Sequence, residues 1–148
     1  MSETMSQKEY DKLVKEKSPK SPIFKDMCLA FIIGGLICAI GQCISVYIKS
    51  FGLNKEDTAS LVSSAMIFLG AFLTGVGVYD RIAKYGKAGT LVPITGFANS
   101  IVSPAMEYKT EGYVLGVGTK MFIIAGPVLV YGITASVIYG IIFFAFGG

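Results

Sequence analysis

Long uncharged stretches dominate the chain and predict helices that cross a membrane. Residues 27–48, 58–79 and 121–148 contain no formally charged side chain. A helix that spans a bilayer needs about 20 mainly apolar residues at about 1.5 Å each, so all three stretches are long enough. In a soluble protein, three such stretches would leave too little chain to cover them. The pattern therefore predicts three transmembrane helices, at about 27–48, 58–79 and 121–146.

A fourth uncharged stretch, residues 88–106, has a different character. It contains Pro93 and Pro104 together with glycines and several hydroxyl and amide side chains. Proline lacks a backbone donor, and it disfavours helical backbone in the residue before it. Irregular backbone at membrane depth is tolerated only where protein shields it or where it lines a wet cavity. We interpret 88–106 as a re-entrant or broken helical segment; an ordinary fourth crossing is the alternative. The expected fold class is an all-α polytopic membrane protein.

The start of the chain is polar and basic, so we separate residues 1–26 from a transmembrane domain at residues 27–148. Tyr10, Leu13 and Val14 recur near helical spacing among many charges, and Met5 extends the pattern. This spacing predicts a short amphipathic helix on the membrane or against a partner, with a disordered basic tail as the alternative. We expect no cleavable signal, because the polar stretch before the first apolar run is long.

The distribution of positive charge predicts the orientation. Lysines crowd the segment before the first predicted span, and Arg81, Lys84 and Lys87 follow the second. Positively charged loops tend to stay in the cytoplasm, so both the N-terminal segment and the 80–87 loop are predicted there. The two assignments agree, because two crossings separate these segments. Tyr47 and Tyr79, at the ends of the first two spans, are expected at the membrane interface.

Composition supports the membrane class and argues against catalysis. The 148 residues are 53% hydrophobic and 16% charged, with a mean hydropathy of +0.62. Soluble domains have about 25% charged residues. The absence of histidine excludes a Ser-His-Asp triad and a histidine-based zinc site. Cysteines in an apolar helix behave as small hydrophobic residues. We therefore expect no enzyme, no cofactor and no metal site.

Small residues at four-residue spacing predict close packing between the helices. Without a hydrophobic driving force in lipid, helices associate where small side chains let their backbones approach. Gly70 and Thr74 form one such pair in the second span. The principal candidates for helix packing are Gly35, Gly75, Gly132, Ser136 and Gly140. Packing could occur within the bundle or against another subunit. Three spans form a thin bundle, so a transport role would need oligomers or a partner.

Two groups of polar residues are candidates for function near the first two spans. Gln42 lies in the middle of the first, and burying an unpaired amide costs a few kcal/mol. It is therefore expected either to face another helix, where its hydrogen bonds hold the two helices together, or to contact a pore or a ligand. Asp80 and Arg81 follow the second span directly. They are either an interfacial anchor pair or an anion-attracting group at the inner mouth, since guanidinium suits carboxylates.

The segment after Pro93 adds further candidates. A break followed by a short helix leaves backbone N–H groups that favour anions, as in transporters with discontinuous helices. Thr95 and Asn99 contribute neutral hydrogen-bonding groups there, and Glu107 could assist a cation. A purely structural kink is the alternative. The candidate residues of a solute path are Gln42, Asp80, Arg81, Thr95, Asn99 and Glu107.

Four motifs carry a resemblance to a known family. They are GGLICAIGQ at 34–42, TGVGVYDRI at 74–82, VPITGFANS at 92–100 and EGYVLG at 111–116. Together, over about residues 27–146, they make the chain resemble the SpoVA family of endospore-forming bacteria. The family tends to have a small residue at the position of Lys87. This departure argues against a tight glycine-type turn there and makes the inner mouth more basic.

The resemblance implies a function that composition does not supply. SpoVA proteins are associated with the inner spore (forespore) membrane, where they move dipicolinic acid with calcium during sporulation and germination. The implied role is a channel subunit, in one view mechanosensitive. The implied partners are membrane lipid, an AEb-like membrane subunit and an AD-like soluble subunit, with dipicolinate and calcium as transported solute and no nucleic acid. A structural or assembly subunit, with the pore formed mainly by a partner, is the alternative function.

Overall fold

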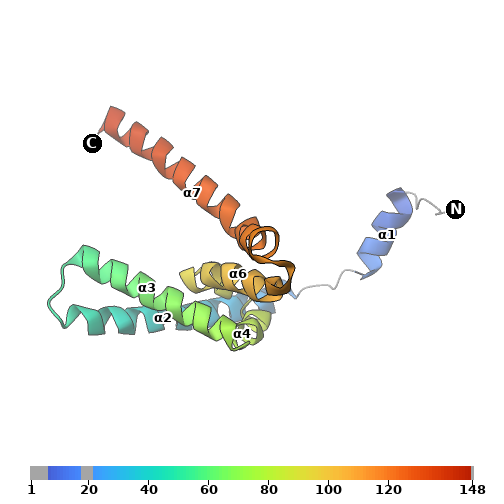
Figure 1. Ribbon diagram of the computed structural model, residues 1–148, viewed down its shortest axis with the longest axis horizontal. Coiled ribbons are helices and arrows are strands. Elements are labelled where there is room, and N and C mark those ends of the chain that lie inside the picture. The colour runs from blue at the N-terminus through green and yellow to red at the C-terminus, as the bar shows by residue number, and fades with distance from the viewer. Residues whose placement is uncertain (1–6, 18–21, 148) are drawn as a thin grey trace.

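The structure, a computed structural model, describes residues 7–17 and 22–147, and every regular element in these ranges is a helix (Figure 1). The elements are α1 (Gln7–Lys17), α2 (Ile23–Lys49), α3 (Lys55–Gly75), α4 (Tyr79–Gly86), α5 (Ala88–Leu91), α6 (Ile94–Glu107), the 3₁₀ turn η1 (Lys109–Glu111), the π-helical turn η2 (Tyr113–Gly118) and α7 (Thr119–Phe146). Three stretches are long and apolar enough to cross a membrane: Ile23–Lys49, Lys55–Gly75 and Tyr113–Phe146. The predicted all-α class with three such helices is confirmed.

Helices α2 and α3 form an antiparallel hairpin (Figure 1). The connecting turn uses Gly52, whose φ of +77° is readily adopted only by glycine. Asn54 then caps α3, because its Oδ1 accepts the backbone N–H of Asp57 at 2.7 Å. Where the two helices cross, Gly41 lies close to the thioether of buried Met66. The polar turn and its cap thus define one end of the hairpin, which we call the loop end.

Helix α1 lies in the segment where the sequence predicted an amphipathic helix. Tyr10, Leu13 and Val14 are exposed on it. The structure therefore has a helix, not an irregular tail, over residues 7–17. Met5 lies outside the described residues. A membrane or partner surface for α1 stays a prediction.

The broken character predicted for residues 88–106 is confirmed. Helix α5 ends at Leu91, and Pro93 has extended backbone, with φ −65° and ψ 158°, before α6 begins. Pro93 can stand there because the first turn of a helix does not need its missing N–H. Pro104, in contrast, is accommodated inside α6, which continues to Glu107.

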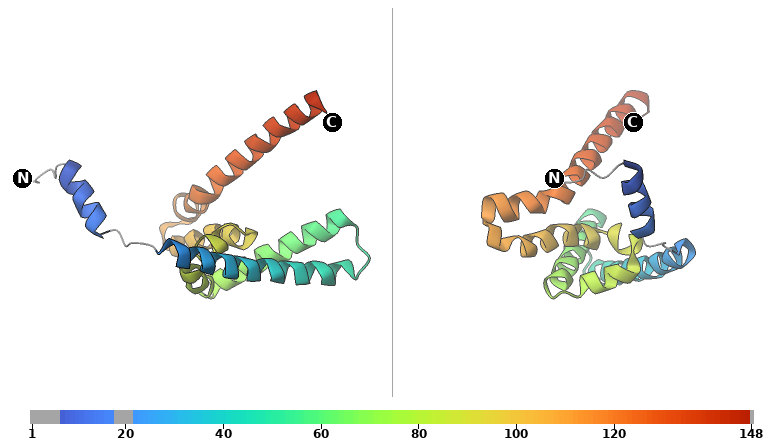
Figure 2. Two further views of the ribbon diagram at one scale, coloured as in Figure 1. Left: turned by 180° about the vertical axis from the view of Figure 1, so that it is seen from behind. Right: turned by 90° about the vertical axis from the view of Figure 1, so that its right-hand side faces the viewer.

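The two parts of this segment enter and leave at the same end of the hairpin. Gly89 of α5 lies against the backbone of Ala30 near the start of α2. Helix α6 runs beside α3 in the same direction, with residue 95 beside Gly70 and Asn99 beside Thr74. Since α3 runs from the loop end toward the start of α2, α6 returns toward that starting end. Figure 2 shows α6 as a short element along one side of the hairpin. This is the geometry of a re-entrant element, not of a fourth crossing.

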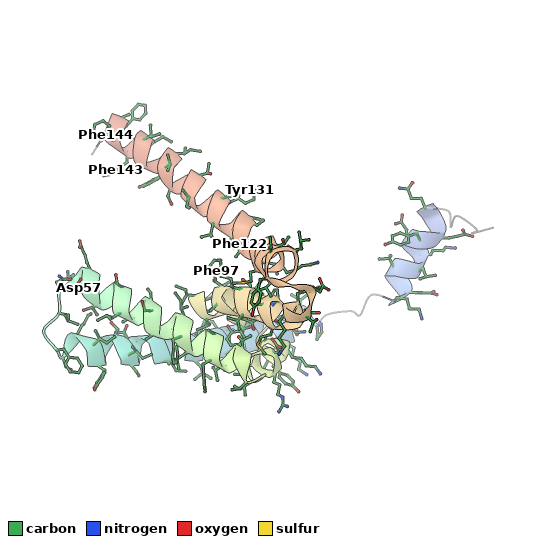
Figure 3. The ribbon with its side chains drawn as sticks, viewed as in Figure 1. Asp57, Phe97, Phe122, Tyr131, Phe143 and Phe144 are labelled. Atoms are coloured by element: carbon green, nitrogen blue, oxygen red, sulfur yellow. The ribbon has the colours of Figure 1, made fainter. Side chains whose placement is uncertain are left out.

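Helix α7 leaves the end where α6 terminates and diverges from the hairpin (Figure 1). It packs against α6 and η2 near its beginning, where Ala125 is fully buried. Beyond that point its side chains project without a neighbouring element, as Figure 3 shows for Tyr131, Phe143 and Phe144. The outer part of α7 is therefore left to lipid or to another chain.

Candidate solute path

A buried set of hydroxyl groups occupies the place where α3, α4, α5 and α6 meet. Thr74, Tyr79, Thr90 and Thr95 have at most 5% of their surface exposed. Gly77, at φ +71°, redirects the chain after α3, so that Tyr79 turns back into the interior. Buried polar groups cost free energy unless they are hydrogen-bonded. These residues are therefore expected to satisfy one another.

The phenol of Tyr79 joins three elements. Its Oη lies 2.8 Å from the carbonyl oxygen of Thr90 and 2.9 Å from Oγ1 of Thr95. The phenol has one hydrogen, which it donates to the carbonyl, so Thr95 donates to the phenol oxygen. Tyr79 lies past the end of the α3 span. Burial raises its pKa above the ordinary value, and the hydrogen bond from Thr95 opposes this rise. The phenol is therefore neutral at physiological pH and keeps the hydrogen that it donates to Thr90.

A second polar contact joins α3 to α6. Oγ1 of Thr74 lies 2.7 Å from the carbonyl oxygen of Gly70 and 2.9 Å from Oδ1 of Asn99. One hydroxyl hydrogen cannot serve two acceptors fully. If the Asn99 amide turns its nitrogen toward Thr74, both contacts become good hydrogen bonds, and this orientation is the physically preferred one.

Glycines allow α6 to approach α3 closely enough for these bonds. A Cβ added at Gly70 would lie 2.8 Å from the Cα and the carbonyl oxygen of Thr95. The packing role predicted for Gly70 and Thr74 is thereby confirmed. Gly96 fills a similar role, because a Cβ there would overlap the carbonyl oxygens of Thr90 and Leu91. The first turn of α6 is consequently closed by the carbonyl groups of α5.

The two path candidates in this region, Thr95 and Asn99, are thus engaged in interior hydrogen bonds. Thr95 is buried and Asn99 is half-buried. Because α5 covers the first turn of α6, little room for a solute is left at the N–H groups that the sequence argument assigned to anions. In the described conformation both residues hold the broken element against α3 and α4. Their contact with a solute stays a prediction.

Tyr79 was expected at the membrane interface in the same way as Tyr47, but its ring is buried in the protein and is not exposed there. Its exposed fraction is 3%, whereas Tyr47 has 67% exposed. Both residues end a predicted span, so position alone could not separate them. The available signal was the pair Gly75 and Gly77 just before Tyr79, which permits a sharp change of direction. The participation of Thr90 could not be predicted from the sequence. Thr90 accepts the hydrogen bond through its backbone carbonyl, which every residue has, and only the fold brings that carbonyl to Tyr79.

Asp80 and Arg81 are exposed on α4. Arg81 lies with the exposed Lys84 and Lys87 at the end of the hairpin where α2 begins, and we call these three residues the basic face. Lys87 has φ 48° and ψ −127°, a conformation that normally requires glycine. The expectation that no such turn forms there is therefore wrong. The carbonyl oxygen of Lys87 accepts both the N–H and the hydroxyl of Thr90, which closes the turn.

The remaining path candidates, Gln42 and Glu107, lie elsewhere. Gln42 is exposed and lines a cleft between α2 and α3 on the loop side of the Gly41–Met66 crossing. Glu107 is exposed beside a smaller cleft of about 200 Å³ between α6 and α7. That cleft also contains Tyr108 and Lys120, whose Nζ lies 4.5 Å from the ring centroid of Tyr108. The six candidates therefore occupy four separate places and form no single path in the chain by itself.

The principal packing candidates make no close approach within the described chain. A Cβ added at Gly35, Gly75, Gly132 or Gly140 would meet no described atom within 4 Å. Ser136 donates its hydroxyl to the carbonyl oxygen of Gly132 on its own helix, at 2.8 Å. Among the described residues, these four glycines therefore make no close contact with another helix. Packing against another subunit stays a prediction for the stripe on α7.

Comparisons with known proteins place the chain among sporulation membrane proteins. A family model described as SpoVAC/SpoVAEB sporulation membrane protein matches residues 26–142. Stage V sporulation protein AC of Bacillus subtilis (strain 168) is 49% identical over 138 residues, which cover 93% of this chain and 92% of that protein. No solved structure matches the chain. The match to the family model begins at residue 26, close to the start of α2, and does not include α1.

Proposed function

Because the chain belongs to the SpoVAC/SpoVAEB family of sporulation membrane proteins, we propose that it is a subunit of a dipicolinic acid channel. The channel would load dipicolinate, with calcium, into the developing spore and release it during germination. Its place would be the inner membrane of the forespore and spore. The family is one of sporulation membrane proteins, and we assign the chain no catalytic role.

One structural observation supports this proposal in addition to the family membership. The element formed by α5 and α6 is a broken, polar, hydrogen-bonded insertion beside two helices long enough to span a membrane. A protein keeps irregular backbone at membrane depth where protein shields it or where it lines a wet cavity. The basic face of Arg81, Lys84 and Lys87 lies at the same end, and it is complementary to a dianion such as dipicolinate.

The proposal requires partners. Helix α7 diverges from the hairpin, and three long helices in this arrangement enclose no channel (Figure 1). We therefore propose assembly with an AEb-like membrane subunit and an AD-like soluble subunit, surrounded by lipid. Opening by membrane tension would fit a subunit whose long helix is not braced by its own chain.

Spores that carry single substitutions test the channel role. We expect Arg81→Ala and Asn99→Leu to lower dipicolinate content or slow its release severalfold, because they remove the anion-attracting charge and the α3–α6 contact. Gln42→Leu should alter release by removing the amide from the cleft. Lys109→Ala and Cys43→Leu are matched controls at exposed positions outside these places. Normal content and release in all three variants, at normal protein levels, would contradict the proposal.

A structural role in assembly is the second candidate, and the uncovered α7 favours it. Leucine at Gly132 or Gly140 should reduce co-purification with the partner subunits, because it blocks the close backbone approach that small residues allow. Normal assembly of both variants would remove this argument. Flux through liposomes that contain the purified chain, alone or with its membrane partner, separates the two functions. Flux from the chain alone excludes a purely structural role.

A further inference from the structure

Two polar stripes face each other near the loop end of the α2–α3 hairpin. On α2 the stripe consists of Gln42, Ser45 and Lys49, and on α3 it consists of Lys55, Thr58 and Ser63. The α2 residues recur at three- and four-residue spacing on one face of that helix, and the α3 residues lie on the side of α3 that lines the same cleft. Between them lies a cleft of about 640 Å³. This volume falls in the range of about 300–1,000 Å³ that is typical of small-molecule sites.

The charge of this cleft is one-sided. Lys49 and Lys55 line it, whereas the carboxylates of Glu56 and Asp57, in the first turn of α3, do not. Figure 3 shows Asp57 at the loop end of the hairpin. Each lysine contributes one positive charge and three donors. The cleft therefore presents two cations without a lining carboxylate to neutralise them.

Neutral donors continue inward from the two lysines. The hydroxyl of Thr58 is committed to the carbonyl oxygen of Asn54 at 2.7 Å. The amide of Gln42 and the hydroxyls of Ser45 and Ser63 line the part of the cleft that is further from the connecting turn, together with the small or apolar residues Cys38, Gly41 and Val62. Such a sequence of charged and then neutral donors suits a small molecule that carries two carboxylates on a compact body. A lipid headgroup phosphate is also an anion that the two lysines could attract, so the tests below separate it from a free dicarboxylate.

We propose that the cleft binds a small dicarboxylate, with Lys49 and Lys55 meeting its carboxylates and Gln42, Ser45 and Ser63 hydrogen-bonding its inner end. The proposal rests on the proposed function, because it adds a second anion site for the transported solute. This site lies at the opposite end of the hairpin from the basic face. Gln42 then has a ligand role, one of the two alternatives that the sequence left open.

Direct binding provides the first test. The full chain in neutral detergent is titrated with dipicolinate, with benzene-1,3-dicarboxylate and with benzoate. We expect the two dicarboxylates to compete and benzoate to bind about tenfold or more weakly, because one charge-assisted contact is lost. The double variant Lys49→Gln/Lys55→Gln should lose at least tenfold in affinity. Lys109→Gln, which removes one positive charge outside the cleft, should leave affinity unchanged. Absence of binding, or equal binding by the double variant, overturns the proposal.

Cys38 provides a second test that does not depend on tight binding. It is exposed and lines the cleft together with Gln42. In a Cys28→Ala/Cys43→Ala background, a negatively charged thiol reagent should modify Cys38 several times faster than a positively charged one of similar size. The double lysine variant should remove this preference, and dipicolinate should slow the reaction. Equal rates for both reagents, in both proteins, would overturn the proposed charge of the cleft.

The same assay distinguishes a lipid from a free dicarboxylate. It is repeated in micelles with and without phosphatidylglycerol. Protection of Cys38 by the anionic lipid and not by the dicarboxylate would make the cleft a headgroup site and overturn the proposal. Failure here remains separate from failure of the channel role. Spores that depend on Arg81 but whose protein binds no dicarboxylate in the cleft keep the channel and lose the inference. If binding requires both lysines but spores of every variant are normal, the binding site is kept and the channel role is lost.

Discussion

Tyr79 and Thr95 show how much of the candidate site depends on contacts that a linear pattern does not contain. Polarity beside Pro93 marked Thr95 and Asn99 as unusual residues of an apolar segment, and both form specific hydrogen bonds. Their partners could not be predicted, because Tyr79 and Thr74 come from a different element and meet them only after the chain turns at Gly77. At the residue scale, the sequence therefore identified special positions but not their roles.

Replacing the buried phenol measures the value of its hydrogen bonds. Tyr79→Phe leaves the Thr90 carbonyl and the Thr95 hydroxyl without the phenol, and unmaking a buried hydrogen bond costs about 1–3 kcal/mol. We expect a lower thermal midpoint in detergent. Tyr47→Phe removes a hydroxyl from an exposed ring and should change little. Equal midpoints for the two variants would show that the Tyr79 contacts do not stabilise the fold.

The backbone at Lys87 supports a prediction of the opposite sign. A non-glycine residue in this region of φ and ψ costs about 1–3 kcal/mol, of which the added flexibility of an unfolded glycine returns a part. Lys87→Gly should therefore stabilise the fold by about 1 kcal/mol, measured by thermal unfolding in detergent. Lys84→Gly, inside α4, should instead destabilise it by about 1 kcal/mol. Destabilisation by Lys87→Gly would contradict the described turn.

At the scale of elements, the broken segment was predictable and its docking was not. Two prolines and many small polar residues are incompatible with a regular lipid-facing helix, so the break at Pro93 follows from local chemistry. The direction of α6 along α3 is set by distant small residues, chiefly Gly70 opposite Thr95. Spacing of small residues occurs in every span of this glycine-rich chain. It could not show that Gly70 packs and that Gly35 does not.

A matched pair of alanine substitutions tests this docking. In Gly70→Ala the new Cβ would lie 2.8 Å from backbone atoms of Thr95, so α6 must move away from α3. We expect a loss of about 1–3 kcal/mol, as for other overpacked contacts. Gly35→Ala meets no described atom within 4 Å and gains helix propensity, so stability should stay equal or rise slightly. Both are measured by thermal unfolding in the same detergent. A tolerated Gly70→Ala would contradict the close approach of the two helices.

At the scale of the whole molecule, the parts that were predictable from the sequence are the class, the three apolar helices and the grouping of positive charge. Lys25, at the start of α2, and Arg81 of the basic face lie at the same end of the hairpin because α2 and α3 are antiparallel. The separation of α7 from the hairpin was not predictable, since nothing in a uniformly apolar helix shows whether its own chain or a partner covers it. The number of crossings stays a prediction, and the return of α6 favours three.

That return fixes a testable topology for the chain. If α2 starts in the cytoplasm, as its flanking lysines favour, then α6 ends in the cytoplasm and α7 crosses to the opposite side. We expect Thr110→Cys, in a chain without its three natural cysteines, to react with an impermeant thiol reagent only from the cytoplasmic face. Gly147→Cys should react only from the other face. Lys84→Cys and Ser50→Cys serve as controls for the two sides, because they mark the basic face and the loop end. Labelling of position 110 from the face that Ser50 marks would mean that α6 crosses the membrane, and labelling of positions 110 and 147 from the same face would mean that α7 does not. Either result contradicts the proposed topology.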